Sequence, residues 1–343
     1  MEAIREALKL LVEGRDLGEL AGRAMREIMG GRCTPSQIGG FLVGLRAKGE
    51  TPEEIAAMAR EMREHAVRIS PRVEGPLVDL CGTGGAPIRT FNFSTVASFV
   101  AAGAGIPVAK HGNRSHTGKC GSADIMEALG VDIHMSPRRV EEAIETVGIG
   151  FLFAPTFHPA MRHAASPRKE LGIRTTFNLL GPLTNPAGVK HQLLGVGAPE
   201  LVDLYPRVLE LLGTKRAMVV HGVGGVDEVS LLGPTLVGEL RDGEIRHYRI
   251  RPESLGLRRA SADEVGELAP AQAAAAATEI LRGNEKGPRY EMAILNAACA
   301  IYVAGRAGSL EEGLELAAES IRSGAAYEKL VALVSFSQRC RTT

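Results

Sequence analysis

The spacing of apolar residues divides the chain into two parts. From residue 1 to about residue 70, apolar positions recur every three or four residues, which predicts helices. A capping threonine, a proline suited to the first helical turn and a side chain that can reach back to the cap occur together in Thr34-Pro35-Ser36-Gln37 and in Thr51-Pro52-Glu53-Glu54. Glycines stand where the preceding helices should end, at Gly30-Gly31 and Gly49. We therefore expect a set of helices at the amino-terminal end.

After Pro71, short apolar runs of β type alternate with helical segments. The β-type runs are 77–81, 108–110, 151–154, 193–196 and 217–221. This alternation is typical of an α/β fold with a mainly parallel central sheet flanked by helices. Segment 239–250 alternates polar with apolar residues around Asp242-Gly243, which predicts an added hairpin. Helical spacing returns in 271–281, in 290–304 and after the possible capping box Ser309-Leu310-Glu311-Glu312.

Segment 155–190 interrupts the alternation. It contains five prolines and three glycines, and it is too long for a simple connection. Two interpretations are open: it folds into short helices that join the amino-terminal helices, or it forms a lid. Both would place Arg162, Arg168 and Arg174 near a domain boundary.

Composition narrows the class of protein. The chain has 343 residues, 45% of them hydrophobic, which is enough for one large domain and a smaller one. Forty basic residues balance forty acidic ones, so we expect no nucleic-acid or membrane partner. The charged start and the lack of a long apolar run predict a cytoplasmic location. The five cysteines show no C-x-x-C spacing and are expected to be reduced thiols.

A glycine-rich stretch follows the first β-type run. Gly82-Thr83-Gly84-Gly85 should bend the chain where a strand leads into a helix, and backbone N–H groups there can face an anion. Asn92, Ser94 and Thr95 add amide and hydroxyl groups at the helix start. The alternatives are a tight turn and a simple helix cap. A phosphate site and a cap are compatible, because Ser and Thr can serve both.

A second polar stretch, Lys110-His111-Gly112-Asn113-Arg114-Ser115, follows the next β-type run. Lys110 ends that run, so we expect its charge at the carboxyl edge of the sheet, where open α/β sheets bind ligands. Gly118-Lys119-Cys120-Gly121-Ser122 adds further polar groups, and Ser122 could also cap the next helix. A lone histidine such as His111 is more often structural, but its neighbours favour a functional role.

A third stretch, 219–228, ends in two adjacent carboxylates, Asp227 and Glu228. Carboxylates beside substrate phosphates are typical Mg²⁺ ligands. The alternative is a loop with two solvated acids. A phosphate site at the same sheet edge favours the metal site.

Together, these motifs resemble those of the anthranilate phosphoribosyltransferase family: a G-T-G-G…T-x-N-x-S-T loop, a K-H-G-N-R loop and an acidic pair after H-G. The resemblance continues through 172–175, 177–186 and 295–298, and so covers nearly the whole chain. It implies a small all-helical domain, residues 1–70 with part of 155–190, hinged to a large α/β domain, residues 71–154 and 191–343. It also implies a homodimer joined through the helical domain.

The resemblance implies roles for individual residues. The residues expected to hold phosphoribosyl pyrophosphate are Gly82, Gly85, Thr90, Asn92, Ser94, Thr95, Lys110 and Ser122. Asp227 and Glu228, with Ser94, would hold Mg²⁺, while Asn113, His111 and Arg168 would face anthranilate. Lys110, Arg168, Asn113 and His111 are the expected catalytic residues. A guanidinium is well shaped to bind the acceptor's carboxylate.

The implied reaction transfers the 5-phosphoribosyl group to the amine of anthranilate. It releases pyrophosphate and gives N-(5-phosphoribosyl)anthranilate, a step of tryptophan biosynthesis. Breaking the bond from ribose C1 to pyrophosphate separates charge, which cationic groups would stabilise. The amine is neutral at pH 7, so we expect positioning to matter more than acid–base catalysis.

Two positions depart from the family pattern. Ala86-Pro87 replaces the common Asp-Gly, which removes a carboxylate and stiffens the loop. His116-Thr117 is similar to the corresponding loop of pyrimidine nucleoside phosphorylases, so phosphorolysis of a nucleoside is the second hypothesis. A third is a binding protein that has lost turnover. Arg168, the glycine-rich loop and the acidic pair favour the transferase.

Overall fold

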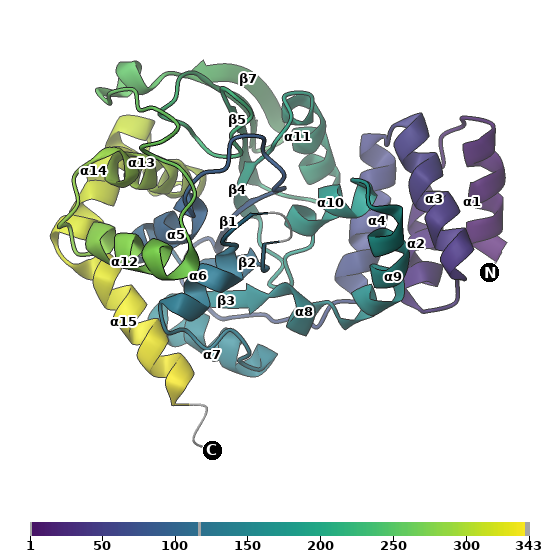
Figure 1. The fold of residues 1–343 in the computed structure, drawn as a ribbon, viewed down its shortest axis with the longest axis horizontal. Helices are drawn as coiled ribbons and strands as arrows, with labels where there is room; N and C mark the ends of the chain where they lie inside the picture. The colour runs from purple at the N-terminus through teal and green to yellow at the C-terminus, as the bar shows by residue number, and fades with distance from the viewer. Residues whose placement is uncertain (1, 116–117, 340–343) are drawn as a thin grey trace.

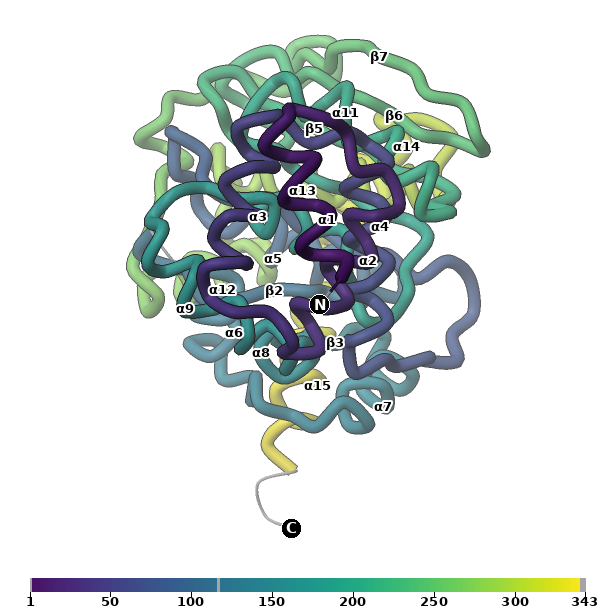
Figure 2. Tube along the Cα trace, turned by 90° about the vertical axis from the view of Figure 1, so that its right-hand side faces the viewer, coloured from purple at the N-terminus to yellow at the C-terminus, as the bar shows by residue number. Residues whose placement is uncertain are grey.

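The structure is a computed structural model that describes residues 2–115 and 118–339. Its amino-terminal part is a helical bundle of α1 (Glu2–Val12), α2 (Glu19–Met29), α3 (Pro35–Lys48) and α4 (Pro52–Glu64). The bundle lies to one side of the sheet in Figure 1 and in front of it in Figure 2. Both predicted capping boxes are confirmed: Thr34 and Thr51 accept the backbone N–H groups of Gln37 and Glu54 at 3.3 Å.

Within the described residues, the strands form one seven-stranded sheet in the order β3-β2-β1-β4-β5-β6-β7. The strands are β1 (Val78–Gly82), β2 (Val108–Gly112), β3 (Ile149–Phe153), β4 (His191–Gly195), β5 (Arg216–Gly222), β6 (Thr235–Arg241) and β7 (Glu244–Ile250). The first five run parallel, and β6 and β7 add the predicted antiparallel hairpin. Its turn places Asp242 and Gly243 at positive φ, 51° and 87°. The mainly parallel sheet is confirmed.

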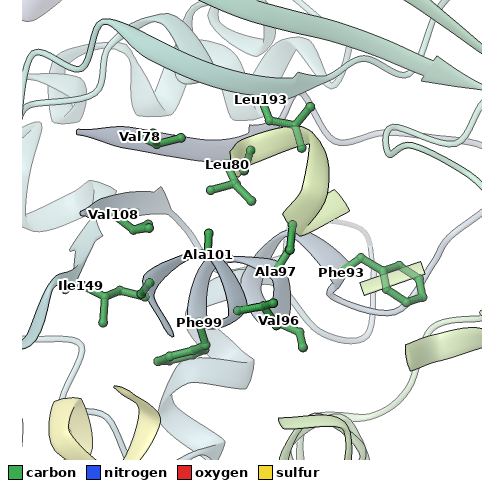
Figure 3. Close-up of a cluster of buried hydrophobic side chains, with 14 of the residues drawn as sticks. Val78, Leu80, Phe93, Val96, Ala97, Phe99, Ala101, Val108, Ile149 and Leu193 are labelled. Atoms are coloured by element: carbon green, nitrogen blue, oxygen red, sulfur yellow. The ribbon is translucent and has the colours of Figure 1, made fainter. Parts of the chain in front are cut away.

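Helices cover both faces of the sheet. On one face lie α5 (Phe93–Gly103), α6 (Ser122–Ala128), α7 (Pro137–Val147), α12 (Pro270–Leu281), α13 (Pro288–Val303), α14 (Leu310–Arg322) and α15 (Ala325–Gln338). Figure 3 shows Ala97 and Ala101 of α5 pointing toward the strands, while Phe99 points to the other side of the helix. Small side chains on this face bring the helix close to the sheet.

The opposite face of the sheet carries α11 (Leu201–Leu211). Side chains alternate along β4 and β5: Leu193 and Met218 join the core around α5, whereas Leu194 and Val219 join the core around α11. This second core continues into the helical bundle, because α4 packs against α11. The bundle is therefore attached to the sheet through shared apolar packing.

Segment 155–190 folds into short helices, as one of the two interpretations predicted. They are α8 (Ala154–Phe157), η1 (Pro159–Met161), α9 (Arg162–Leu171), α10 (Thr176–Leu180) and η2 (Gly181–Leu183). α9 packs against α2 and α3, and α10 packs against α3 and α4. Ala164, Phe177 and Leu180 lie in the apolar core of the bundle. The remaining short element is η3 (Pro252–Leu255).

The strand order reverses direction between β1 and β4. β1 leads through α5 to β2 on one side, and β4, far along the chain, pairs with β1 on the other side. Ligands of open α/β sheets bind at such a switch point, outside the carboxyl ends of the strands. None of the helices in the described part is long and apolar enough to cross a membrane.

Candidate active site

The glycine-rich loop begins at Gly82, the last residue of β1. Gly84 and Gly85 have positive φ of 65° and 74°, so the expected turn is present. Thr83 donates its backbone N–H to Gly195 O at the end of β4 (2.9 Å). Gly84 donates its N–H to Asp227 Oδ2 (3.1 Å). The loop is thereby bonded both to β4 and to the predicted metal ligand.

Asp227 is packed between two strand ends that must be glycine. A Cβ at Gly82 would lie 2.8 Å from Asp227 Oδ2, and a Cβ at Gly195 would lie 1.7 Å from Asp227 O. Any larger residue there would displace the acidic loop. The ends of β1 and β4 therefore fix the position of this carboxylate.

The start of α5 differs from the expected set of free phosphate donors. The helix begins at Phe93, so Ser94 and Thr95 lie in its first turn. Ser94 already donates its N–H to Glu228 Oε1 (3.2 Å), and Asn92 donates from Nδ2 to Cys120 O (3.0 Å). A carboxylate at a helix N-terminus is favoured by the helix dipole. The anion that meets the start of α5 is thus Glu228.

Thr95 and Thr90 occupy different surroundings. The Oγ1 of Thr95 is buried and has no hydrogen-bond partner in the described part of the chain. Thr90 lies on a short bridge that pairs residues 89–91 with residues 265–267, opposite Gly266. Thr95 directly follows Ser94, whose N–H Glu228 accepts, whereas Thr90 pairs with Gly266 at the far end of the glycine-rich loop.

Lys110 corrects one expectation. It lies inside β2 instead of ending it, and its side chain is only 2% exposed. Its Nζ donates to Leu80 O and to Ser94 Oγ (3.3 Å). The β2 strand continues to Gly112 because it pairs with β3 along its whole length. The ammonium therefore lies between β1 and the start of α5, next to the glycine-rich loop.

Burial disfavours the ionised forms of Asp227 and Glu228. Burial raises the pKa of Asp227, although its hydrogen bond from Gly84 and the charges of Arg174 and His221 oppose the rise. Burial and the neighbouring Asp227 raise the pKa of Glu228 to about 8, against the charge of Lys110. A divalent cation would replace the proton and stabilise both carboxylates. Two carboxylates and the Ser94 hydroxyl fit the preference of Mg²⁺ for oxygen ligands completed by phosphates.

The loop after β2 is held by its own polar groups. Asn113 N donates to Ser122 Oγ (3.1 Å), and Ser122 Oγ donates to Asn113 O (3.2 Å). Ser122 does not cap α6, contrary to our expectation: Gly121 is the N-cap, and Asp124 accepts its N–H at 2.8 Å. Ser122 is already the first residue of α6, and its hydroxyl is bonded to Asn113, so it does not occupy the N-cap position. His116, on which the second hypothesis rests, lies outside the described residues.

His111 faces a second histidine that the sequence did not single out. Its ring lies 5.2 Å from the ring of His158, which follows α8. Both Nε2 atoms are buried and lack a hydrogen-bond partner among the described residues. Burial lowers the pKa of His111 well below 6.5 and that of His158 to about 4. Both imidazoles are therefore neutral near pH 7.

Arg168 lies on α9, in the same 155–190 segment as His158. Its guanidinium stacks over the ring of Phe177 at 5.0 Å, and burial lowers its pKa. An arginine held over an aromatic ring keeps its N–H edge available for a carboxylate. Within the described residues, Arg168 forms no hydrogen bond or ring contact with His111 or Asn113.

The structure thus joins Gly82, the loop to Gly85, Ser94, Lys110, Asp227 and Glu228 into one connected set. Sequence reasoning missed His158 and the buried acid Asp79. Asp79 Oδ1 accepts the His111 N–H (3.2 Å), and its Oδ2 has no partner in the described residues. An acid inside an apolar run was the available signal for Asp79. A histidine in a proline-rich segment carried none.

Two family models match this chain, and both belong to the glycosyl transferase family. Residues 74–327 match the model of the glycosyl transferase family, a/b domain, and residues 5–66 match the glycosyl transferase family, helical bundle domain. Those two matches correspond to the sheet with its helices and to the bundle described above.

Individual relatives then narrow the class to one family. The anthranilate phosphoribosyltransferases of Thiobacillus denitrificans and Aquifex aeolicus are 51% and 49% identical to this chain. The alignments cover 98% and 99% of it, and 98% and 100% of those proteins. The crystal structure of anthranilate phosphoribosyltransferase from Thermus thermophilus has a TM-score of 0.92 at 47% identity, covering 98% of this chain and all of that one. The chain belongs to the anthranilate phosphoribosyltransferase family.

One solved structure of a relative contains ligands. It is anthranilate phosphoribosyltransferase from Saccharomyces cerevisiae in complex with PRPP and Mg. It is 28% identical to this chain, with a TM-score of 0.90, and 98% of each chain is covered. The similarity in fold therefore extends to a distant relative.

Proposed function

We propose that this protein transfers the 5-phosphoribosyl group from phosphoribosyl pyrophosphate to the amine of anthranilate and releases pyrophosphate. One observation carries the proposal: Lys110, Ser94, Asp227 and Glu228 converge on the glycine-rich loop at the switch point of the sheet. This arrangement offers a cation, a hydroxyl and two metal-binding carboxylates where a diphosphate would sit. Membership of the family supports the same reaction.

The chemistry follows from where charge develops. As the bond from ribose C1 to the diphosphate breaks, negative charge grows on the leaving group, and Lys110 lies buried close enough to stabilise it. Burial strengthens this interaction, because water screens it less. The acceptor amine approaches as a neutral group. Positioning of the two substrates then supplies most of the rate, and exclusion of water prevents hydrolysis of the sugar.

We assign acceptor binding to the side of the site that carries His111, His158, Asn113 and Arg168. The Arg168 guanidinium would bind the carboxylate of anthranilate. The neutral imidazoles of His111 and His158 offer buried Nε2 atoms as hydrogen-bond partners for the amine. Two buried neutral imidazoles together with one guanidinium suit an aromatic acceptor that carries a single carboxylate.

Ser94, Asp227 and Glu228 would hold Mg²⁺. When bound, the ion would neutralise charge on the diphosphate and favour its departure. The raised pKa values of both carboxylates support a cation at this position. The yeast relative in complex with PRPP and Mg supports the same choice of metal.

Three further expectations stay predictions: the domain division at about residue 70, a homodimer through the helical bundle, and a cytoplasmic location. Light scattering coupled to gel filtration would test the dimer. Val12 at the end of α1 is 88% exposed and Val43 on α3 is 42% exposed, so apolar surface is available on the bundle.

The test of the reaction is direct. Purified protein is mixed with phosphoribosyl pyrophosphate, Mg²⁺ and anthranilate, and the loss of anthranilate fluorescence is followed. We expect loss that requires all three additions. Cleavage of uridine or thymidine by phosphate, without use of anthranilate, would instead establish the nucleoside phosphorylase hypothesis. Donor binding without turnover on any acceptor would identify a binding protein.

A further inference from the structure

Arg174 links the 155–190 segment to the donor loop. It lies between α9 and α10, just after Gly172, whose left-handed φ of 62° ends α9. Its Nη1 donates to Gly84 O at 3.2 Å. The side chain therefore crosses from the elements that pack on the bundle to the loop that follows β1.

The contact depends on a glycine. A Cβ at Gly85 would lie 1.5 Å from Arg174 Nη1, so a side chain at that position would push the guanidinium away from Gly84 O. Two features favour glycine at position 85: its φ of 74° and the close approach of Arg174. The guanidinium lies against the bare backbone of the donor loop.

Arg174 also brings charge to the site. It is near enough to Asp227 to lower the pKa of that carboxyl, against the effect of burial. Among residues 2–115 and 118–339 it forms no ion pair, and its side chain is exposed. A guanidinium has five N–H donors, and the bond to Gly84 O uses one of the two Nη groups. Most of its hydrogen-bonding capacity is free beside the donor loop.

The other cation of this site is placed differently. Lys110 is buried, and its Nζ already donates to Leu80 O and Ser94 Oγ. A diphosphate carries several negative charges, so it can accept a further cationic side chain besides this ammonium and a divalent ion held by Asp227 and Glu228. Arginine matches phosphate oxygens with two parallel hydrogen bonds.

We propose that Arg174 is a donor-binding residue that contacts the diphosphate of phosphoribosyl pyrophosphate beside Gly84. This assignment rests on the proposed function and adds a ligand contact from the segment that carries Arg168. Donor and acceptor binding residues then stand six positions apart in one chain segment.

The test measures binding without turnover. Pyrophosphate with Mg²⁺, and separately ribose 5-phosphate, are titrated by calorimetry into the wild-type protein and into Arg174→Ala, Arg174→Lys and Arg162→Ala. Arg162 is an exposed arginine of the same segment and serves as the matched control. We expect Arg174→Ala to weaken pyrophosphate binding about tenfold, as for a hydrogen bond to a charged group, and to change ribose 5-phosphate binding less than twofold. Arg174→Lys should be intermediate, and Arg162→Ala should match wild type.

Two outcomes would overturn the assignment. Equal losses for pyrophosphate and ribose 5-phosphate would mean that Arg174 only shapes the loop. Unchanged or tighter pyrophosphate binding in Arg174→Ala would mean that Arg174 only bonds to Gly84 O in the ligand-free protein and does not contact the diphosphate. The proposed function is judged separately, by turnover of anthranilate in the wild-type protein, so that its failure cannot be mistaken for failure of the Arg174 assignment.

Discussion

The two halves of the site differ in how their polar atoms are satisfied. On the donor side, Asp227 and Glu228 each accept a backbone N–H, from Gly84 and Ser94. On the acceptor side, His111 and His158 each keep a buried Nε2 without a partner among the described residues. The carboxylates of the donor side are held by backbone hydrogen bonds before any ligand binds. The imidazoles of the acceptor side are neutral, and each has a nitrogen without a hydrogen bond in the described part of the chain.

The difference shows what each half can recognise. Backbone N–H groups fix the carboxylates in place, so little reorganisation is needed when a cation and phosphates bind. Unpaired buried nitrogens cost free energy until a ligand supplies hydrogen bonds. The acceptor half therefore gains most from a ligand with polar groups of its own, such as an aromatic amine with a carboxylate.

The largest effect should come from breaking the donor side. The double substitution Asp227→Ala, Glu228→Ala removes both carboxylates, and we expect turnover to fall by about 100-fold or more, since an electrostatic stabiliser is lost. Mg²⁺ should no longer strengthen donor binding in calorimetry. The dipeptide Asp263-Glu264 is exposed and provides the matched control. An unchanged Mg²⁺ titration in the variant would exclude the pair as metal ligands.

The acceptor side predicts a pH effect on stability. The pKa of His158 is about 4 when folded, below its ordinary value of 6.5, so the unfolded chain binds more protons between these values. Above pH 6.5, His158 does not lower the free energy of unfolding. As the pH falls toward 5, protonation of His158 in the unfolded chain lowers the free energy of unfolding by about 2 kcal/mol. Urea unfolding at pH 7.5 and 5 measures this. His158→Asn should reduce the difference in the free energy of unfolding between pH 7.5 and pH 5. Substitution of the exposed His247 by Asn should leave that difference unchanged. The same difference in both variants would contradict the assignment.

Arg168→Ala sharpens the comparison further. We expect the KM for anthranilate to rise about tenfold through loss of a charged hydrogen bond, with the KM for phosphoribosyl pyrophosphate nearly unchanged. Steady-state kinetics with each substrate varied gives both values. Lys169→Ala removes the adjacent exposed cation and is the control. If both KM values rose together, Arg168 would not be specific to the acceptor.

The smallest effect concerns rigidity of the donor loop. Pro87 packs against Gly225, where a Cβ would lie 2.5 Å from its Cγ. Pro87→Gly adds freedom to the unbound loop and should weaken donor binding about threefold. Ala86→Gly, in the same loop but without the ring contact, should have less effect. Calorimetry with pyrophosphate and Mg²⁺ distinguishes them, and identical losses would mean that the ring contact is unimportant.

Much of the fold could be read from local signals. The capping boxes at Thr34 and Thr51 and the Asp242-Gly243 turn each depend on residues a few positions apart, and all three appear as predicted. The capping serine at Ser309 accepts the Glu312 N–H as expected. The side chain of Glu312, however, bonds to Gly308 N (2.6 Å), one residue before the expected partner.

The rest depended on contacts between distant segments. Lys110 is buried because its Nζ reaches Leu80 O on β1 and its strand pairs with β3 at Phe151, both far from it in the sequence. Ser122 does not have its predicted capping role because α6 begins one residue earlier than expected, with Gly121 as the N-cap. His158 and Arg174 acquire meaning only when the 155–190 segment is folded back toward β1 and β2. No local pattern marked His158, and the sequence placed Arg174 only near a domain boundary.

The glycines at the ends of β1 and β4 set limits for redesign of this protein. Because Asp227 fills the space where their side chains would be, libraries that vary Gly82 or Gly195 should yield mostly inactive variants. Efforts to broaden the range of aromatic acceptors have more latitude around His158 and Phe177, where side chains meet side chains. Engineering effort is best directed there.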